Sequence, residues 1–172
     1  MLWTIVTPLA LAAPQELDAV VRALSMRDPT PCDAVEALTP MAAANDVTLA
    51  LMATARVHVQ GNPTALGRVI RNLVDNAVRH APPGGEVRLT VERRDGVAIA
   101  EVRNDGAAIA PEDLDRVFDR FYRAKDGMAS QNGHAGLGLS IVKAIAEASG
   151  GRAAAASDAT GTSFSIQLPA AD

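Results

Sequence analysis

The chain has little cysteine, few aromatic side chains and no long apolar run. Cys32 is the only cysteine among 172 residues, which excludes an internal disulfide and fits a reducing, cytoplasmic compartment. Aromatics make up 3% of the residues, so aliphatic side chains and alanine must fill the core. The apolar residues 1–13 are too few to span a bilayer, contain Pro8 and lack Lys and Arg. We expect them to be the stub of an upstream helical element, with a secretory signal as the alternative.

Basic charge is also scarce. The sequence has 16 Lys and Arg against 20 Asp and Glu, a net charge of −4, and no long basic stripe, which argues against nucleic acid as a partner. Hydrophobic residues make up 48% and charged residues 21%, as in a globular protein. The length fits one domain with a short appendage.

Periodicity and turn residues divide the chain into elements. Asn62 and Pro63 predict the cap and first residue of a long helix, which the Pro-Pro-Gly-Gly run 82–85 ends. Asp95-Gly96 is typical of a two-residue hairpin turn. We expect a short helix and a Pro-rich connector within 14–31, helices over 33–45, 63–81, 112–123 and 137–149, strands over 47–52, 57–60, 86–94, 97–104, 152–157 and 162–168, and a mobile loop over 124–136.

The long helix carries the most informative pattern in the sequence. At about 100° per residue, Asn72, Asn76, Arg79 and His80 fall on one face. Carboxamides one turn apart, followed by a cation, suit a hydrated metal ion bridging phosphates. The alternative is an ordinary surface helix with a polar face. The adjacent, core-facing side holds Leu66, Val69, Ile70, Leu73 and Ala77.

Two further segments suit a ligand. Glycines at 136 and 138, with Leu137, Leu139 and Ser140, lead from the loop into a helix, where free N–H groups and partial positive charge favour phosphate. The alternative is simply a loop entering a helix. In the strand 97–104, alternation directs Asn104 with Val102 toward the covered side of the sheet, where a ligand pocket could lie.

Together these segments resemble the sensor histidine kinases, within the superfamily that also holds gyrase-type ATPases and Hsp90. The resemblance covers about residues 30–169, with five motifs in the family's order. They are the N box NLVDNAVRH (72–80), the first glycine box NDGAAIAPED (104–113), the Phe box VFDRFYR (117–123), the second glycine box with its helix GLGLSIVKAIAEASGG (136–151), and the closing element GTSF (161–164).

The resemblance implies an α+β two-layer sandwich, the Bergerat ATP-binding fold. About three helices would cover one face of a mixed sheet, with ATP between the layers under a mobile lid. Asn76 would coordinate Mg²⁺, with Asn72, Arg79 and His80 near the phosphates, and Arg123 would reach the γ-phosphate. The remaining nucleotide contacts would come from Asn104, Gly106, Ala108, Ile109, Gly136, Leu137, Gly138, Leu139, Ser140 and Thr162, with Thr162 near the adenine.

The resemblance also indicates whether the γ-phosphoryl group of ATP is transferred to a protein or hydrolysed. Superfamily ATPases carry a water-activating glutamate one turn before the metal-binding Asn. Here that position is Asn72, which cannot act as a general base at neutral pH. We therefore expect Asn72 and Arg123 to serve transfer of the γ-phosphoryl group to a histidine on a separate, dimerising hairpin, with positioning and charge neutralisation as the protein's main task.

Two positions depart from the family pattern. Asn104 stands where an Asp usually accepts a hydrogen bond from the adenine amine, which costs about 1 kcal/mol of charge assistance. Asp105 could take over only if strand alternation broke. Ala108 replaces a glycine and adds about 1 kcal/mol of strain if its φ is positive. These changes predict weakened but not abolished binding.

The family's phosphoacceptor motif is absent, and none of His58, His80 and His134 is a credible acceptor. We expect a stub at residues 1–31, a catalytic ATP-binding domain at 32–169 and a tail at 170–172. The chain would bind ATP, Mg²⁺ and the phosphoacceptor hairpin, and would act indirectly on a response regulator. Any anchor in the inner membrane would come only from upstream segments. The alternatives are a degenerate nucleotide-binding or protein-interaction module and an anti-sigma-factor-type serine kinase.

Overall fold

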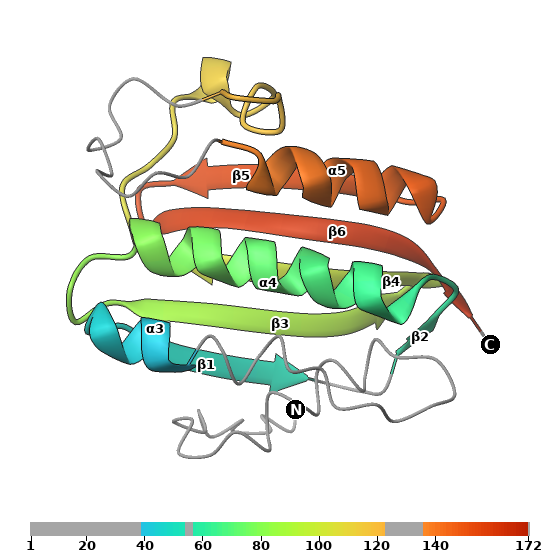
Figure 1. Cartoon of the computed structure of the whole chain (residues 1–172), viewed down its shortest axis with the longest axis horizontal. Helices are drawn as coiled ribbons and strands as arrows, with labels where there is room; N and C mark the ends of the chain where they lie inside the picture. The colour runs from blue at the N-terminus through green and yellow to red at the C-terminus, as the bar shows by residue number, and fades with distance from the viewer. Residues whose placement is uncertain (1–38, 54–56, 123–135, 172) are drawn as a thin grey trace, which may run out of the picture.

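The computed structural model describes residues 39–53, 57–122 and 136–171, and places two helices over one face of a six-stranded mixed sheet (Figure 1). The strand order is β1-β3-β4-β6-β2, and β5 also pairs with β6. Only the β1–β3 pair is parallel among these strands. The elements are α3 (Thr39–Ala44), β1 (Thr48–Ala53), β2 (His58–Val59), α4 (Pro63–His80), β3 (Glu86–Arg94), β4 (Val97–Asn104), the 3-10 turn η1 (Pro111–Asp113), α5 (Gly138–Ala148), β5 (Arg152–Asp158) and β6 (Gly161–Ala171). The predicted two-layer fold is confirmed.

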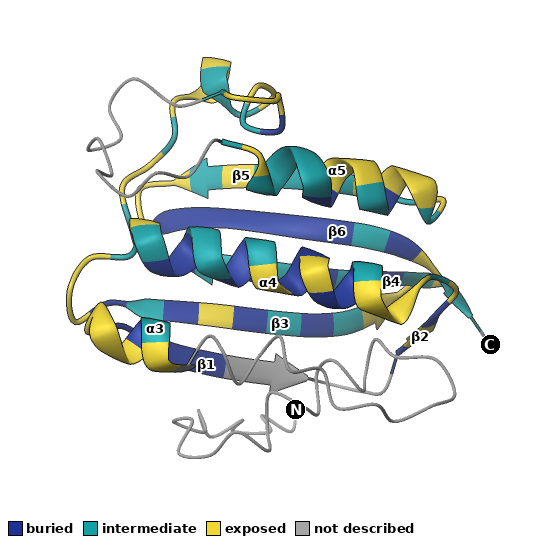
Figure 2. Ribbon diagram, viewed as in Figure 1, coloured by how far each residue is buried: buried dark blue, intermediate teal, exposed yellow. Residues whose placement is uncertain are grey.

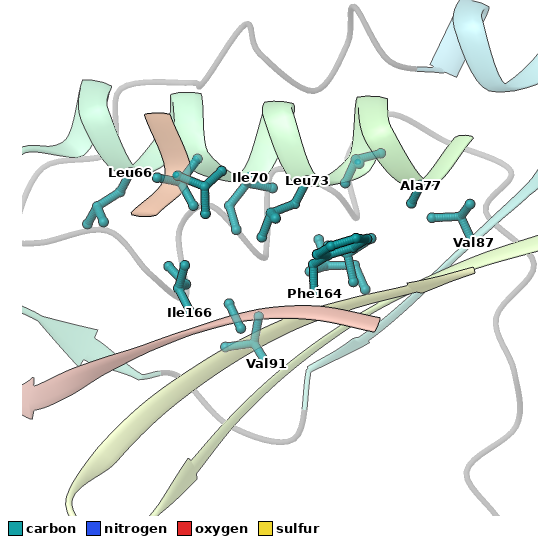
Figure 3. Close-up of a cluster of buried hydrophobic side chains, with 14 of the residues drawn as sticks. Leu66, Ile70, Leu73, Ala77, Val87, Val91, Phe164 and Ile166 are labelled. Atoms are coloured by element: carbon teal, nitrogen blue, oxygen red, sulfur yellow. The ribbon is translucent and has the colours of Figure 1, made fainter. Parts of the chain in front are cut away.

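Helix α4 forms as its sequence predicts. The side chain of Asn62 accepts a hydrogen bond from the N–H of Ala65 at 3.2 Å, and Pro63 occupies the first turn. The helix ends where Ala81 turns to an extended conformation ahead of Pro82. Its apolar stripe packs on the sheet, as Figure 3 shows for Leu66, Ile70, Leu73 and Ala77 above Val87, Val91, Phe164 and Ile166.

The β3–β4 hairpin places the polar end of β4 under the helices. Asp95 and Gly96 have φ values of 51° and 76°, so both turn residues are left-handed, as a two-residue turn requires. Alternate residues of β4, from Ala98 to Asn104, are buried, and Figure 2 shows the burial along these central strands. The prediction that Asn104 faces the covered side is confirmed.

The prediction of a helix over 112–123 is wrong. Within the described residues 111–122, only η1 is helical, and irregular turns follow it to Tyr122. Phe118 is buried, with its ring edge-on to Phe164 at a centroid distance of 6.3 Å. Phe121, three residues later, is 69% exposed. Its φ of 65° leaves the helical region and lets its N–H donate to the carbonyl of Gly136 at 3.2 Å.

Other boundaries differ less. Helix α3, described from Thr39 to Ala44, agrees with the end of the helix expected over 33–45. Strand β6 continues to Ala171, so Ala170 and Ala171 of the expected tail pair with β2. The helix and connector expected within 14–31, residues 33–38 and the loop 124–135 lie outside the described residues. In the part of the chain that the structure describes, no helix is long and apolar enough to cross a membrane.

Candidate functional site

One end of the sandwich collects the ends of five elements. Helix α4 and strands β4 and β5 finish there, and β6 and α5 start there, at the left of Figure 1. The strand register places Asn104, Thr162 and Ser157 opposite one another on β4, β6 and β5. Each of the three lies two residues from a side chain of the core on its own strand, namely Val102, Phe164 and Ala155. Because side chains two residues apart on a strand share a face, this row lies on the face that the helices cover. The sheet therefore ends in a polar row beneath the predicted site.

The two helices of the predicted site touch through Asn72. Its side-chain amide donates to the carbonyl of Gly138, the first residue of α5, at 3.4 Å. Asn76 lies one turn further along α4 and is half-buried. The carboxamide face of α4 and the glycine-led start of α5 are therefore brought together, as the sequence pattern required.

The start of α5 suits an anion. Gly136 has a φ of 63°, and a side chain there would lie 3.1 Å from the carbonyl oxygen of Tyr122. Leu137 makes no side-chain cap, so its helix begins with uncapped N–H groups. The hydroxyl of Ser140 donates to the Leu137 carbonyl at 2.9 Å, and Leu139 packs against the core.

The last turn of α4 carries a neutralised cation and a histidine. Arg79 forms an ion pair with Asp75 at 2.9 Å, and both side chains are about three-quarters buried. His80 is exposed, yet the protein atoms around its ring lower the pKa of its imidazole by desolvation, and the charge of Arg79 adds to that. At neutral pH the ring is therefore uncharged and can both donate and accept a hydrogen bond.

Asn104 is 2% exposed and has partners for both ends of its amide. Its oxygen accepts from the N–H of Gly106 at 3.1 Å, and its nitrogen donates to the carbonyl of Thr162 at 3.2 Å. Asp105 does not replace it, because that carboxylate is exposed and accepts from the N–H of Glu86 at 3.1 Å. The alternation of β4 therefore holds to its end.

The loop after β4 passes very close to the end of α4. A Cβ atom on Gly106 would lie 1.9 Å from the carbonyl oxygen of His80, so only glycine fits. The strain considered for Ala108 does not arise: in residues 39–53, 57–122 and 136–171, positive φ at non-glycine residues is confined to Asp46, Asp95 and Phe121. One of the two reasons for weakened binding is therefore removed.

A small hydroxyl cluster that the motifs did not reveal joins this loop to the sheet. The Oγ of Ser157 accepts from the N–H of Ile109 at 2.9 Å and lies 2.7 Å from the hydroxyl of Thr162. Thr162 in turn donates to the carbonyl of Ala107 at 3.3 Å. Ser157 was missed because its only signal is its cross-strand position, which requires the register.

The Phe-box segment approaches the same end of the molecule. The hydroxyl of Tyr122 donates to the carboxylate of Asp113, which raises the pKa of the phenol, and the guanidinium of Arg116 lies 4.6 Å from the ring centre. Arg123, the predicted γ-phosphate contact, lies outside the described residues.

The donor set fits a metal that arrives with its nucleotide. In the described part of the chain, no group of three or more His, Cys, Asp or Glu residues could hold an ion. The neutral amide oxygen of half-buried Asn76 suits Mg²⁺, which keeps waters and takes phosphate oxygens as its other ligands.

Comparison with known proteins agrees with this geometry. The model of the family described as "Histidine kinase-, DNA gyrase B-, and HSP90-like ATPase" matches residues 61–172, well over half of the chain. The chain belongs to this ATPase family. The resemblance drawn from the five motifs is thereby confirmed.

The relatives of this ATPase domain are sensor kinases. Sensor histidine kinase CusS of Escherichia coli K12 is 42% identical over 115 residues, which are 67% of this chain and 24% of that protein. Sensor-like histidine kinase SenX3 of Mycobacterium tuberculosis H37Rv is 37% identical over 126 residues, 73% of this chain and 31% of that protein. The mycobacterial sensor histidine kinase MprB superposes with a TM-score of 0.72 at 29% identity, covering 80% of this chain and 91% of that structure. The domain thus spans a quarter to a third of these two curated relatives, both of which are histidine kinases.

Proposed function

We propose that this domain binds Mg-ATP and passes the γ-phosphoryl group to a histidine on a phosphoacceptor hairpin supplied by another segment or chain. The contact of Asn72 with Gly138 carries the proposal, because it joins the metal-binding face of α4 to the phosphate-binding start of α5. A triphosphate between them would meet Asn76 and His80 on one side and the first N–H groups of α5 on the other. Mg²⁺, when bound, would supply charge neutralisation at the phosphates.

The base would lie at the polar end of the sheet. Asn104, Thr162 and the loop through Gly106, Ala108 and Ile109 surround that end, and Asn104 and Thr162 are buried where β4 and β6 meet. Purine rings suit such a place, because apolar walls cover their faces and a few polar groups read their edges. Asn104 and Thr162 already form hydrogen bonds within the protein, so both side chains are oriented before the base binds.

Transfer is favoured over hydrolysis by the side chains of α4. Asp75 is the one acidic residue of this helix, and it is paired with Arg79. No carboxylate of α4 is therefore poised to activate water. An incoming histidine nitrogen would form a bond to the γ-phosphorus while the bond to the β,γ-bridging oxygen breaks, and ADP would leave with that electron pair.

Labelled ATP tests the proposal. The chain is mixed with Mg²⁺, γ-labelled ATP and a purified phosphoacceptor hairpin of a sensor histidine kinase, and we expect label on histidine that is lost in acid. Asn76→Ala should abolish labelling, whereas Asn45→Ala, which removes a surface amide on the turn after α3, should not. Acid-stable label would indicate a serine kinase.

A module that only binds nucleotide is the second candidate, and the neutral amide of Asn104 favours it. Saturable binding of Mg-ATP without any labelled hairpin would support that candidate. If titration of the chain to millimolar Mg-ATP shows no saturable site, both candidates fail.

A further inference from the structure

Ser157 is the one member of the polar row that none of the five motifs contains. It lies on β5 directly opposite Thr162 of β6. Ala153 and Ala155 of the same strand pack against the core, so alternation directs Ser157 to the helix-covered face. Its hydroxyl thus sits between the sheet and the loop that carries Ile109.

The hydrogens in this cluster can be counted. The Oγ of Ser157 accepts from Ile109, lies 2.7 Å from the Thr162 hydroxyl and can donate to the carbonyl of Gly161 at 3.3 Å. Each hydroxyl has one hydrogen. If Ser157 donates to Thr162, then Thr162 donates to the Ala107 carbonyl; if Thr162 donates to Ser157, then Ser157 donates to Gly161. In both arrangements the hydrogen of Thr162 has an acceptor within the protein, and its oxygen keeps a lone pair for a ligand.

The turn beside Ser157 is held independently of it. Asp158 accepts hydrogen bonds from the N–H of Thr160 at 2.8 Å and from its hydroxyl at 2.6 Å. Arg103 reaches the same carboxylate from β4 at 2.8 Å. These bonds of Asp158 hold the register between β5 and β6, so removing the hydroxyl of Ser157 alone should leave the two strands paired.

We propose that Ser157 is a positioning residue that sets the base selectivity of the nucleotide site. By holding Ile109 and offering a lone pair to the hydrogen of Thr162, it biases Thr162 toward accepting, which favours a base edge bearing an amino group over one bearing a carbonyl. The inference rests on the proposed function, in which Thr162 lies at the base. A carbonyl on the ligand could be paired only if the hydrogen of Thr162 left its protein acceptor, and the loss of a buried hydrogen bond discriminates between ligands.

The test compares Mg-ATP with Mg-ITP, whose base has a carbonyl in place of the amine. Calorimetry on the whole chain gives Kd for both nucleotides, and thermal melting monitors the fold. In Ser157→Ala we expect binding of ATP to weaken about tenfold and binding of ITP to change less than about twofold. Ser157→Thr keeps the hydroxyl and should keep the preference for ATP.

Ser165→Ala is the matched control. It removes a buried hydroxyl from the opposite face of the same sheet and should leave both Kd values unchanged. The inference is overturned if Ser157→Ala retains the wild-type preference, or weakens ATP and ITP by the same factor, as a merely structural role would. It is also overturned if the wild-type chain binds ITP as tightly as ATP. None of these results contradicts the proposal that the wild-type chain binds ATP. A wild-type chain that binds neither nucleotide would contradict the proposed function as well.

Discussion

The side-chain amide of Asn72 donates to the backbone carbonyl of Gly138 at 3.4 Å, and this contact joins α4 to α5 at the candidate site. The two residues are 66 positions apart in the chain. Among the described residues, a side chain at Gly138 would meet only Asn72, at ordinary contact distance. The contact therefore joins the two helices of the candidate site, and the Asn72 side chain does not crowd the first residue of α5.

Asn72→Glu should convert transfer into hydrolysis. The carboxylate would provide the base that α4 lacks, and a positioned base contributes about 10²-fold or more to proton transfer. We expect phosphate release from Mg-ATP, measured without any hairpin, to rise at least about tenfold. Asn72→Gln, which retains an amide, is the control, and equal phosphate release from the two variants would contradict the assignment.

Asn76→Ala should weaken Mg-ATP more than metal-free ATP. The substitution removes the one oxygen that we assign to the metal while leaving the phosphate-binding start of α5 in place. We expect Kd for Mg-ATP to rise about tenfold or more, with Kd for ATP in chelator nearly unchanged. Calorimetry with and without Mg²⁺ measures both, and equal losses in the two conditions would remove Asn76 from the metal site.

Gly106→Ala should destabilise the fold. The added methyl would meet the carbonyl oxygen of His80 at 1.9 Å, so the loop or the end of α4 must move. We expect the free energy of unfolding in denaturant to fall by about 2 kcal/mol or more. Gly138→Ala is the control for stability, since its nearest neighbour would be the Asn72 side chain at 3.9 Å, and a similar loss in both variants would refute the steric argument.

Asp158 should contribute stability that is lost in acid. Hydrogen bonds from the hydroxyl and backbone N–H of Thr160, and then from Arg103, lower the pKa of its carboxyl from 3.8 to about 2. Because the folded pKa is the lower one, the contribution is complete above the unfolded value and disappears as the pH falls through about 2. The difference in unfolding free energy between wild type and Asp158→Asn should therefore narrow from about pH 5 downward.

The same carboxyl can be followed directly by NMR titration. Thr160→Ala removes the hydroxyl that contributes most and should raise the pKa of Asp158 more than Arg103→Gln does. The reverse order would show that the ion pair, and not the turn, controls this group.

Most of the helices and strands could be predicted because their signals are local. The cap at Asn62, the apolar stripe of α4 and the Asp95-Gly96 turn act within a few residues, and each has the predicted conformation. The segment 112–122 could not be predicted, although its apolar spacing resembles a helix. Its path depends on the contact of Phe118 with Phe164 and on the bond from Phe121 to Gly136, which lie outside any local window.

The candidate site divides in the same way. Residues in a motif, such as Asn76 and Ser140, could be named in advance, because a helix or a helix start determines which way they point. Ser157 has no such pattern around it, and the tight approach of Gly106 to His80 joins residues 26 positions apart.

The resemblance of five motifs was sufficient for the family and the two-layer architecture. The carboxamide face of α4 followed from periodicity, which operates over one or two helical turns. The strand register, the absence of strain at Ala108 and the hydroxyl cluster around Ser157 depended on how the elements pack. A register is set by the burial of a whole sheet face and not by any one strand, so the partners of a polar residue at the end of a strand emerge only when the sheet is assembled.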